Sequence, residues 1–470
     1  MAKSRPLWKK PDLEPRRRDE RADALTPTSG ESGRAIVIEP MLKHAAARVT
    51  ARSAADTRTP EARLEEAAGL ARAIDLNVVQ AGLVPLNNIR PATYLGTGKV
   101  DEIAGLTKSL SASVVIMDCP ISPVQQKNLE KAWNAKVIDR TGLILEIFGR
   151  RARTKEGALQ VEHAHLTYQK TRLVRAWTHL ERQRGGFGFL GGPGETQLEA
   201  DRRIIEERIA KIEDDLDKVK RTRKLHRDSR KRVPYPIVAL VGYTNAGKST
   251  LFNRMTQATV LSADMLFATL DPTLRAIDLP HGIRVILSDT VGFISDLPTM
   301  LVAAFRATLE EVIEADIILH IRDMSHEDSG AQSQDVAKVL GGLGIEAADR
   351  RMIEVWNKID RLDAEGRARI LNLAERQPAE NRPVTVSALS GEGMDRLIAA
   401  IETRLGESRL TMDLLLDPSD GAGLSWLYRH SEVLAKGMDE DGKLAVTVRA
   451  DPKNADMVRR KFLPQVPVQY

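Results

Sequence analysis

Apolar positions near the start of the chain form short runs that alternate with helix-like stretches. The apolar runs lie at 35–42, 75–84 and 113–118, and the helix-like stretches at 60–73 and 99–110. Strands that alternate with helices favour a small α/β domain, which we place at residues 33–154. The preceding residues 1–32 are rich in charge, proline and serine, a composition typical of a disordered basic tail.

The spacing of apolar residues then changes to that of packed helices. Leucines fall seven apart in a first half, and apolar residues follow steps of four and three in a second half. They are Leu159, Leu166, Leu173 and Leu180, followed by Ile205, Ile209, Ile212, Leu216 and Val219. The pattern predicts an antiparallel helical hairpin over residues 155–232, with the glycine-rich segment 185–196 as its tip loop. Helices of this length would project roughly 40 Å.

Beyond residue 233 the apolar runs become those of a buried parallel sheet. Five runs are almost continuously apolar, while a sixth, at 274–279, alternates and joins the next run through Pro280, His281 and Gly282. We therefore expect an α/β multidomain protein whose domain at residues 233–406 has a mostly parallel sheet with one antiparallel edge strand. Residues 407–470 read as a small C-terminal α+β domain, and the sequence does not indicate its role.

A phosphate-binding motif follows the first strand of that domain. Residues 242–249 read GYTNAGKS, which fits G-x-x-x-x-G-K-[ST] in full, between a strand and a helical run. Backbone N–H groups of such a loop surround phosphates, the lysine reaches the β and γ phosphates, and the hydroxyl binds Mg²⁺. The motif assigns to the nucleotide Gly242, Tyr243, Thr244, Asn245, Ala246, Gly247, Lys248 and Ser249.

Two later segments indicate that the base is guanine. Asn357, Lys358, Ile359 and Asp360 end a strand, at the edge where doubly wound sheets bind ligands. A carboxylate at Asp360 can accept hydrogen bonds from guanine N1–H and its 2-amino group, a pair of donors that adenine lacks. The next loop contains Ser387, Ala388 and Leu389, from which we expect the Ala388 N–H to reach guanine O6 and Asn357 to tie the base loop to the phosphate loop.

Two segments between these motifs are candidates for sensing the γ phosphate. Asp289, Thr290, Val291 and Gly292 end another strand, and we expect Asp289 to hold Mg²⁺ through water and the Gly292 N–H to meet the γ phosphate. The second segment, which we interpret as a switch loop, comprises Phe267, Ala268, Thr269, Leu270 and Asp271. Thr269 would bind Mg²⁺ only with a triphosphate, and Thr273 is the competing candidate. We therefore assign Mg²⁺ binding to Ser249, Thr269 and Asp289. The candidate catalytic residues, which would contact the phosphates, are Lys248, Thr269 and Gly292.

Composition adds constraints on compartment and partner. The only cysteine is Cys119, which excludes an internal disulfide and is compatible with a reducing cytoplasm. No apolar run is long enough to span a bilayer, so we expect a cytoplasmic protein, and we expect a monomer. The net charge of +5 is concentrated in the tail and in residues 150–232, which favours a polyanionic partner such as RNA.

Taken in order, GYTNAGKST, LFATLDPT, DTVGF, NKID and SAL resemble the HflX family of bacterial GTPases. GTGKVDEI, the run from Val137 to Glu162 and the GGFGFLGGPGETQLE loop are also similar to that family, so the resemblance covers about Ile36 to Gly406. It implies a GTPase that binds the large ribosomal subunit and splits or rescues stalled ribosomes under stress. Asn245 resembles a residue that binds K⁺ in some related GTPases.

Two further hypotheses follow for the partner and the rate. Phe187 and Phe189 at the tip, with Arg182 and Arg184 beside them, are candidate contacts to RNA bases and phosphates, although the phenylalanines alternatively pack on their own domain. Phe293 follows the D-x-x-G glycine, where some GTPases keep a glutamine that orients water, so we predict slow hydrolysis without a partner.

The alternative function is a GTP-gated RNA-binding or ribosome-assembly factor without splitting activity. An RNA-modifying enzyme is disfavoured, because no metal cluster or nucleophile–base pair has a recognisable spacing. An ATP-driven remodeller is disfavoured as well, because the loop Gly96–Lys99 lacks the first glycine and the final hydroxyl of a phosphate loop.

Overall fold

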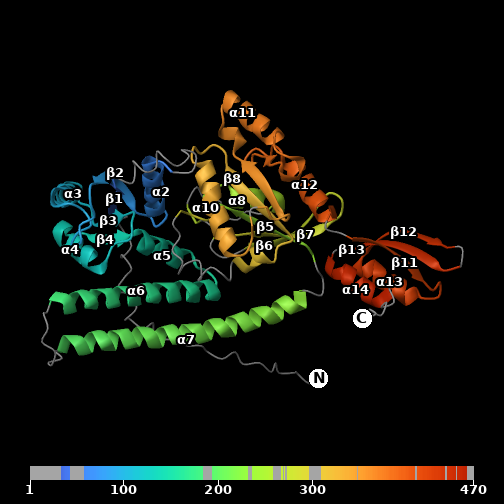
Figure 1. Ribbon diagram of the computed structural model, residues 1–470, viewed down its shortest axis with the longest axis horizontal. Coiled ribbons are helices and arrows are strands. Elements are labelled where there is room, and N and C mark those ends of the chain that lie inside the picture. Colours follow the sequence, from blue (N-terminus) through green and yellow to red (C-terminus); the bar gives the residue numbers. More distant parts are fainter. Residues whose placement is uncertain are drawn as a thin grey trace, which may run out of the picture.

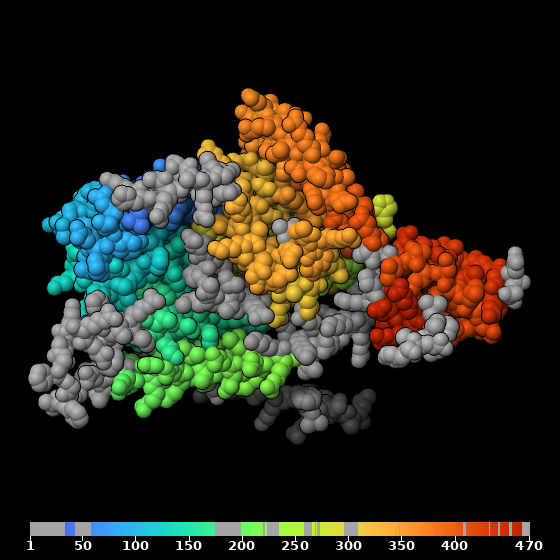
Figure 2. Space-filling view, in the orientation of Figure 1, coloured from blue at the N-terminus to red at the C-terminus, as the bar shows by residue number. Residues whose placement is uncertain are grey.

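A computed structural model gives the architecture of the chain as three sheets and a long helical hairpin (Figure 1). The residues that it describes are 33–42, 58–183, 193–230, 235–257, 266–267, 269, 273–295, 309–346, 348–407, 410–439, 442–450 and 452–462. The N-terminal and nucleotide domains lie side by side, the hairpin runs beneath them, and the C-terminal domain extends from one end (Figure 2). None of the described helices is long and apolar enough to cross a membrane.

The N-terminal domain is a four-stranded sheet with the order β2-β1-β3-β4, and every pair in it is parallel. Its strands are β1 (Arg34–Leu42), β2 (Asn77–Leu86), β3 (Val114–Met117) and β4 (Lys136–Asp139). Its helices are α2 (Pro60–Arg72), α3 (Thr97–Ser109), α4 (Pro123–Trp133) and α5 (Arg140–Arg151). Thr59, Ser122 and Asp139 accept hydrogen bonds from the first turns of α2, α4 and α5, so local capping sets where these helices begin.

The hairpin consists of α6 (Lys155–Gln183) and α7 (Pro193–Arg230). Two ion pairs join the helices, Glu162–Arg208 and Lys170–Glu206. The residue numbers rise along α6 while those of their partners fall along α7, so the two helices are antiparallel as expected. Helix α7 begins inside the range predicted as tip loop, since proline suits the first turn of a helix.

Helix α6 lies against the N-terminal domain. This helix packs on α4 and α5 of the N-terminal domain, and its Arg172 and Tyr168 both bind the Asp139 carboxylate, at 3.0 and 2.6 Å. Asp139 also caps α5, so one buried carboxylate fixes the hairpin to the domain before it. Figure 1 shows α6 and α7 lying along the underside of the molecule.

The nucleotide domain contains a six-stranded sheet with the order β10-β9-β8-β5-β7-β6. Its strands are β5 (Ile237–Gly242), β6 (Thr273–Asp278), β7 (Arg284–Asp289), β8 (Ile317–Asp323), β9 (Met352–Asn357) and β10 (Val384–Thr385). Its helices are α8 (Lys248–Thr256), α10 (Ser329–Gly342), α11 (Ala364–Glu375) and α12 (Met394–Glu407), with short 3₁₀ turns at Ile359–Arg361 and Ala379–Asn381. Among the described strands of this sheet only β6 is antiparallel, which confirms the predicted α/β class and edge strand.

The C-terminal domain is an antiparallel sheet of three strands with two helices. Its elements are β11 (Leu410–Leu416), α13 (Gly421–His430), β12 (Glu432–Met438), β13 (Leu444–Ala450) and α14 (Pro452–Phe462), and β13 lies between the other two strands. Alternate residues of β11 and β13 are buried and form, with Leu427 and Val458, a core of their own.

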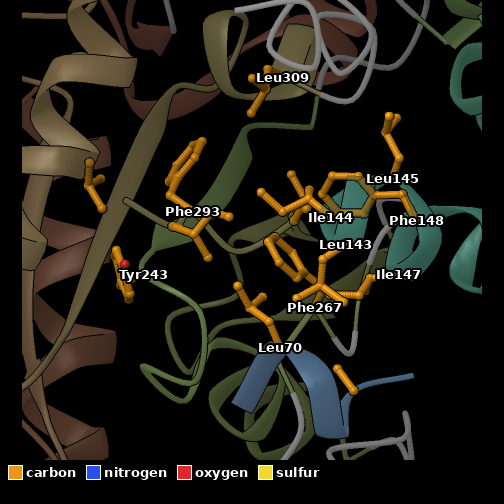
Figure 3. Close-up of a cluster of buried hydrophobic side chains, with 14 of the residues drawn as sticks. Leu70, Leu143, Ile144, Leu145, Ile147, Phe148, Tyr243, Phe267, Phe293 and Leu309 are labelled. Carbon is orange, nitrogen blue, oxygen red and sulfur yellow. The ribbon is translucent and has the colours of Figure 1, made fainter. Parts of the chain in front are cut away.

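One hydrophobic core crosses from the N-terminal domain into the nucleotide domain. Leu70 on α2 and Phe148 on α5 belong to the same buried cluster as Tyr243, Phe267 and Phe293 (Figure 3). Burial of apolar surface is the main favourable term in folding, so the two domains stabilise each other. The nucleotide loops that carry these aromatic residues are therefore held partly by the N-terminal domain.

Candidate functional site

The phosphate loop connects β5 to α8 at the carboxyl edge of the sheet. Gly242 has φ +152°, and a Cβ there would lie 2.2 Å from the Ile321 carbonyl oxygen. Gly247 has φ +95°, and a Cβ there would lie 2.2 Å from Asn357 Nδ2. Only glycine fits either position, because both the backbone angle and the neighbouring atoms exclude a side chain.

Lys248 is buried at the start of α8. Its ammonium group donates to the carbonyl oxygens of Gly242, at 3.2 Å, and Tyr243, at 2.8 Å. Burial lowers the pKa of Lys248 to about 8, although the nearby Asp289 carboxylate opposes that change. The phosphate loop thus holds a desolvated cation, which phosphate oxygens would favour in its charged form.

Three oxygen-bearing side chains converge beside this lysine. The Ser249 and Thr269 hydroxyls each donate to Asp289 Oδ2 at 2.8 Å, and the two hydroxyl oxygens lie 3.0 Å apart. Asp289 is fully buried, which raises the pKa of its carboxyl, and its Oδ1 has no hydrogen-bond partner. The competing Thr273 is the first residue of β6. The contacts of Thr269 with Asp289 and Ser249 thus favour Thr269 over Thr273 as the candidate ligand.

These oxygens fit Mg²⁺, which prefers oxygen ligands and usually keeps several waters. Within the described parts of the chain, no group of three His, Cys, Asp or Glu side chains is placed to hold a metal. Mg²⁺ would be held by the hydroxyls of Ser249 and Thr269, and by Asp289 through water, with phosphate oxygens completing its shell.

The segment after β7 lies against the phosphate loop. Phe293 N–H donates to the Gly242 carbonyl at 3.1 Å, and its own carbonyl accepts from Thr244 N–H at 2.7 Å. Thr290 donates its hydroxyl to Leu240 O in the neighbouring strand, and Val291 is buried. Gly292 therefore lies directly beside the loop that would hold the phosphates.

The base loop is built as predicted at Asn357. Its Nδ2 donates to the Ala246 carbonyl at 2.8 Å, which ties the base loop to the phosphate loop. Lys358 has φ +64° and pairs with Asp323 at 2.8 Å, while Ile359 is buried and Asp360 is exposed at the edge.

The Ala388 N–H, which we expect to reach guanine O6, has a partner within the chain. That group donates to Asn357 Oδ1 at 2.9 Å, so the Asn357 carboxamide also joins the base loop to the loop after β10. Ser387 is buried and its hydroxyl accepts from Ser390 N–H, whereas Leu389 is exposed.

Several predicted residues cannot be placed. Ala268, Leu270, Asp271, Arg184, Phe187 and Phe189 lie outside the described residues, and Arg182 is described only as part of the backbone of α6. Phe267 is described and has φ +56°, a rare conformation for a bulky residue. Its ring packs edge-on against Phe148 of α5 with centroids 4.7 Å apart, which holds it in place (Figure 3).

The N-terminal domain contributes to this site through residues that no sequence motif indicates. Glu66 on α2 accepts hydrogen bonds from the hydroxyls of Tyr243 and Ser295, and Arg140 on α5 donates to Ser295 as well. Glu66 and Tyr243 are 177 residues apart, and no spacing in the sequence connects them. The sequence offers one sign of this contact, the charged Glu66 beside the buried apolar residues of α2.

Comparison with known families accounts for most of the chain. Four family models match it: "GTP-binding GTPase N-terminal" at residues 61–149, "GTP-binding GTPase Middle Region" at 151–230, "50S ribosome-binding GTPase" at 237–358 and "HflX C-terminal domain" at 372–468. The last match extends the likeness past Gly406, where the sequence motifs ended.

Individual relatives agree with the family models. A protein named GTPase HflX from Magnetococcus marinus is 50% identical over 378 residues, which cover 80% of this chain and 86% of the relative. A GTPase HflX from Escherichia coli is 48% identical over 359 residues, or 76% of this chain and 83% of the relative. Among solved structures, a complex of SsGBP with GDP aligns with a TM-score of 0.45 and 22% identity over 79% of this chain and 98% of that one, which supports no inference.

Proposed function

The chain belongs to the HflX family of GTPases, and from that premise we propose that it binds the large ribosomal subunit and couples the GTP cycle to splitting or rescue of stalled ribosomes. GTP binding and hydrolysis follow from the family and from the phosphate-loop fold. The observation that carries the ribosomal part is the match of residues 237–358 to a family described as a 50S ribosome-binding GTPase.

Hydrolysis in this site is mostly a matter of position and charge. Lys248 neutralises the phosphates, Ser249, Thr269 and Asp289 would hold Mg²⁺, and the Gly292 N–H faces the γ phosphate. Mg²⁺, when bound, draws charge from the phosphate oxygens. The described residues around Lys248 include no obvious general base, so we assign the rate chiefly to electrostatic stabilisation.

Guanine is selected by Asp360, with Asn357 as a positioning residue. Because Asn357 bonds both the Ala246 carbonyl and the Ala388 N–H, the base loop and the phosphate loop keep one relative position. An exposed carboxylate at Asp360 is then free to meet the two donors of guanine.

Phe293 is the reason to expect slow hydrolysis in the absence of a partner. Its ring is buried in the core shared by the two domains (Figure 3), so it neither polarises nor orients water. The water must be positioned by another group or by a rearrangement of these loops on the ribosome.

The hairpin supplies charge for a contact with RNA. Arg203 and Lys218 on α7 are largely exposed, although each pairs with an acidic neighbour on the same helix. Exposed ion pairs of this kind are weak, so a phosphate can replace the acidic partner at small cost. The exposed Arg221 adds to this surface, and the tip remains a prediction.

Light scattering of intact ribosomes tests the splitting activity. Ribosomes are mixed with the protein and GTP, a non-hydrolysable GTP analogue or GDP, with the Lys248→Ala variant as control. We expect scattering to fall with GTP and the analogue but not with GDP or the variant. Binding to the large subunit without any loss of scattering would favour the assembly factor, and absence of binding would refute the ribosomal proposal.

A further inference from the structure

A carboxylate of the N-terminal domain bridges two loops of the nucleotide site. Glu66 lies on α2 and is largely buried. One of its oxygens accepts from the Tyr243 hydroxyl in the phosphate loop, and the other accepts at 2.9 Å from the Ser295 hydroxyl, three residues after Gly292. Glu66 therefore holds the phosphate loop and the γ-phosphate segment together from outside their own domain.

Two arginines fix this carboxylate in place. Arg58 donates to Glu66 at 2.7 Å and stacks over the Tyr243 ring, with its Cζ 4.6 Å from the centroid. Arg140 donates to Glu66, to Asp118 at 2.6 Å, and to both the carbonyl and the hydroxyl of Ser295 at 2.9 Å. Burial by itself raises the pKa of Glu66, but the two guanidinium groups outweigh it and hold the pKa at about 2. The group is thus an anion at every physiological pH.

The same contacts connect the two loops to each other. Ser295 N–H donates to the Tyr243 hydroxyl at 2.7 Å, and a parallel bridge joins Tyr243 to Phe293. Buried charges with several partners are costly to assemble, and apolar residues often replace them without loss of stability. A buried anion that bonds two loops of a nucleotide site fixes the position of those loops relative to each other.

The position that these contacts hold leaves little room beside Lys248. A Cβ on Gly292 would lie 3.0 Å from Lys248 Nζ and 2.9 Å from Thr244 Cα. An oxygen that accepts from both the lysine and the Gly292 N–H holds two hydrogen bonds of about 2.9 Å each. A γ phosphate between these groups therefore requires Lys248, Gly292 or both to shift, and a shift of Gly292 would carry Ser295 with it because only three residues separate them.

We propose that Glu66, Arg140 and Ser295 form a latch between the domains that opposes GTP more than GDP, and that breaks when the γ phosphate displaces the segment of Gly292. Glu66 and Arg140 are positioning residues in this scheme, because neither touches the nucleotide. The N-terminal domain thereby senses which nucleotide is bound. This inference rests on the roles proposed above for Lys248 and Gly292, and it is independent of the ribosomal partner.

The latch predicts an effect on the ratio of two affinities. Energy spent on opening a latch weakens only the ligand that requires it to open. Removing hydrogen bonds to a charged group should therefore tighten the binding of a GTP analogue about tenfold and leave GDP binding within about twofold. A residue with a merely structural role would change both affinities in the same direction.

The experiment measures dissociation constants of GDP and a non-hydrolysable GTP analogue for the full chain by fluorescence titration. Glu66→Gln keeps the shape and removes the charge, while Ser295→Ala removes one hydroxyl and guards against a Glu66 variant that does not fold. The control is Glu130→Gln on α4, whose hydrogen bonds go to Gln126 and Val137 in its own domain.

The latch is supported if both latch variants bind the GTP analogue more tightly and bind GDP unchanged. In the Glu130→Gln control, neither dissociation constant should change. Equal changes for the two nucleotides, or no change, would overturn it. If the unsubstituted protein binds neither nucleotide, the assignment of the site itself fails, which is a different result from a failure of the latch.

Discussion

Replacing Phe148 tests whether the N-terminal domain supports the magnesium site. Phe148 is fully buried on α5, and its ring packs on Phe267, two residues before Thr269. Phe148→Ala should cost about 3–5 kcal/mol of stability in the core that joins the domains. Of this, the aromatic pair accounts for about 0.5–1.5 kcal/mol, which is the part that reaches Phe267.

That smaller energy sets the size of the functional effect. If the pair with Phe267 helps to hold Thr269 beside Asp289, its loss should raise the half-saturating Mg²⁺ concentration for GTP hydrolysis by about 2- to 13-fold. Hydrolysis is measured over a range of Mg²⁺ concentrations, well below the unfolding temperature. Phe148→Leu keeps most of the side-chain volume. Its half-saturating Mg²⁺ concentration should therefore lie between those of Phe148→Ala and the unsubstituted protein.

A matched control separates this effect from general destabilisation. Leu129 is equally buried but belongs to a different core cluster, within the N-terminal domain. Leu129→Ala should cost about 2–5 kcal/mol and leave the Mg²⁺ dependence unchanged. If both variants shift the Mg²⁺ dependence alike, or if Phe148→Ala does not shift it, the proposed support of Thr269 is refuted.

Three further predictions concern the base loop and the interdomain carboxylate. Asp360→Asn should weaken GTP binding and reduce the preference for guanine over adenine nucleotides in competition titrations, and an unchanged preference contradicts the assignment. Asn357→Ala leaves the Ala246 carbonyl and the Ala388 N–H without their partner, so it should cost about 2–4 kcal/mol in unfolding experiments and weaken GDP and GTP alike, whereas Asn357→Asp should keep only the bond from Ala388. Because the pKa of Glu66 is held at about 2 against an ordinary 4.5, its charge stabilises the fold above pH 4.5 by about 3 kcal/mol, and this is lost as the pH falls towards 2. The stability difference from Glu66→Gln, followed by denaturant unfolding, should therefore narrow below pH 4.5, and a constant difference refutes the low pKa.

The parts of the nucleotide site that consist of contiguous residues could be predicted from the sequence. The phosphate loop and the base loop each follow a strand, and the parallel sheet brings strand ends together, so the tie from Asn357 to the phosphate loop could be foreseen. The partner of the Ala388 N–H could not be foreseen, because it depends on whether that group meets Asn357 Oδ1 or guanine O6. Motifs indicate which residues form a loop but not the direction of each hydrogen bond.

The contacts between domains were not predictable for a different reason. Apolar periodicity shows which face of α5 or α6 is buried, but not which partner covers it. Arg172 lies in the basic stretch that favoured an RNA surface, whereas the structure uses it, like Arg140 at the start of α5, to bind buried carboxylates. Long-range ion pairs of this kind have no spacing in the sequence, so only the folded chain shows them.

The rate of GTP hydrolysis with and without purified large ribosomal subunits tests the central claim most directly. Small subunits serve as the control, and the Lys248→Ala variant excludes hydrolysis by contaminants. The account predicts slow turnover by the protein alone, and a rise of at least tenfold that saturates with large subunits only. Fast turnover without ribosomes, or a rate that large subunits do not change, would contradict it.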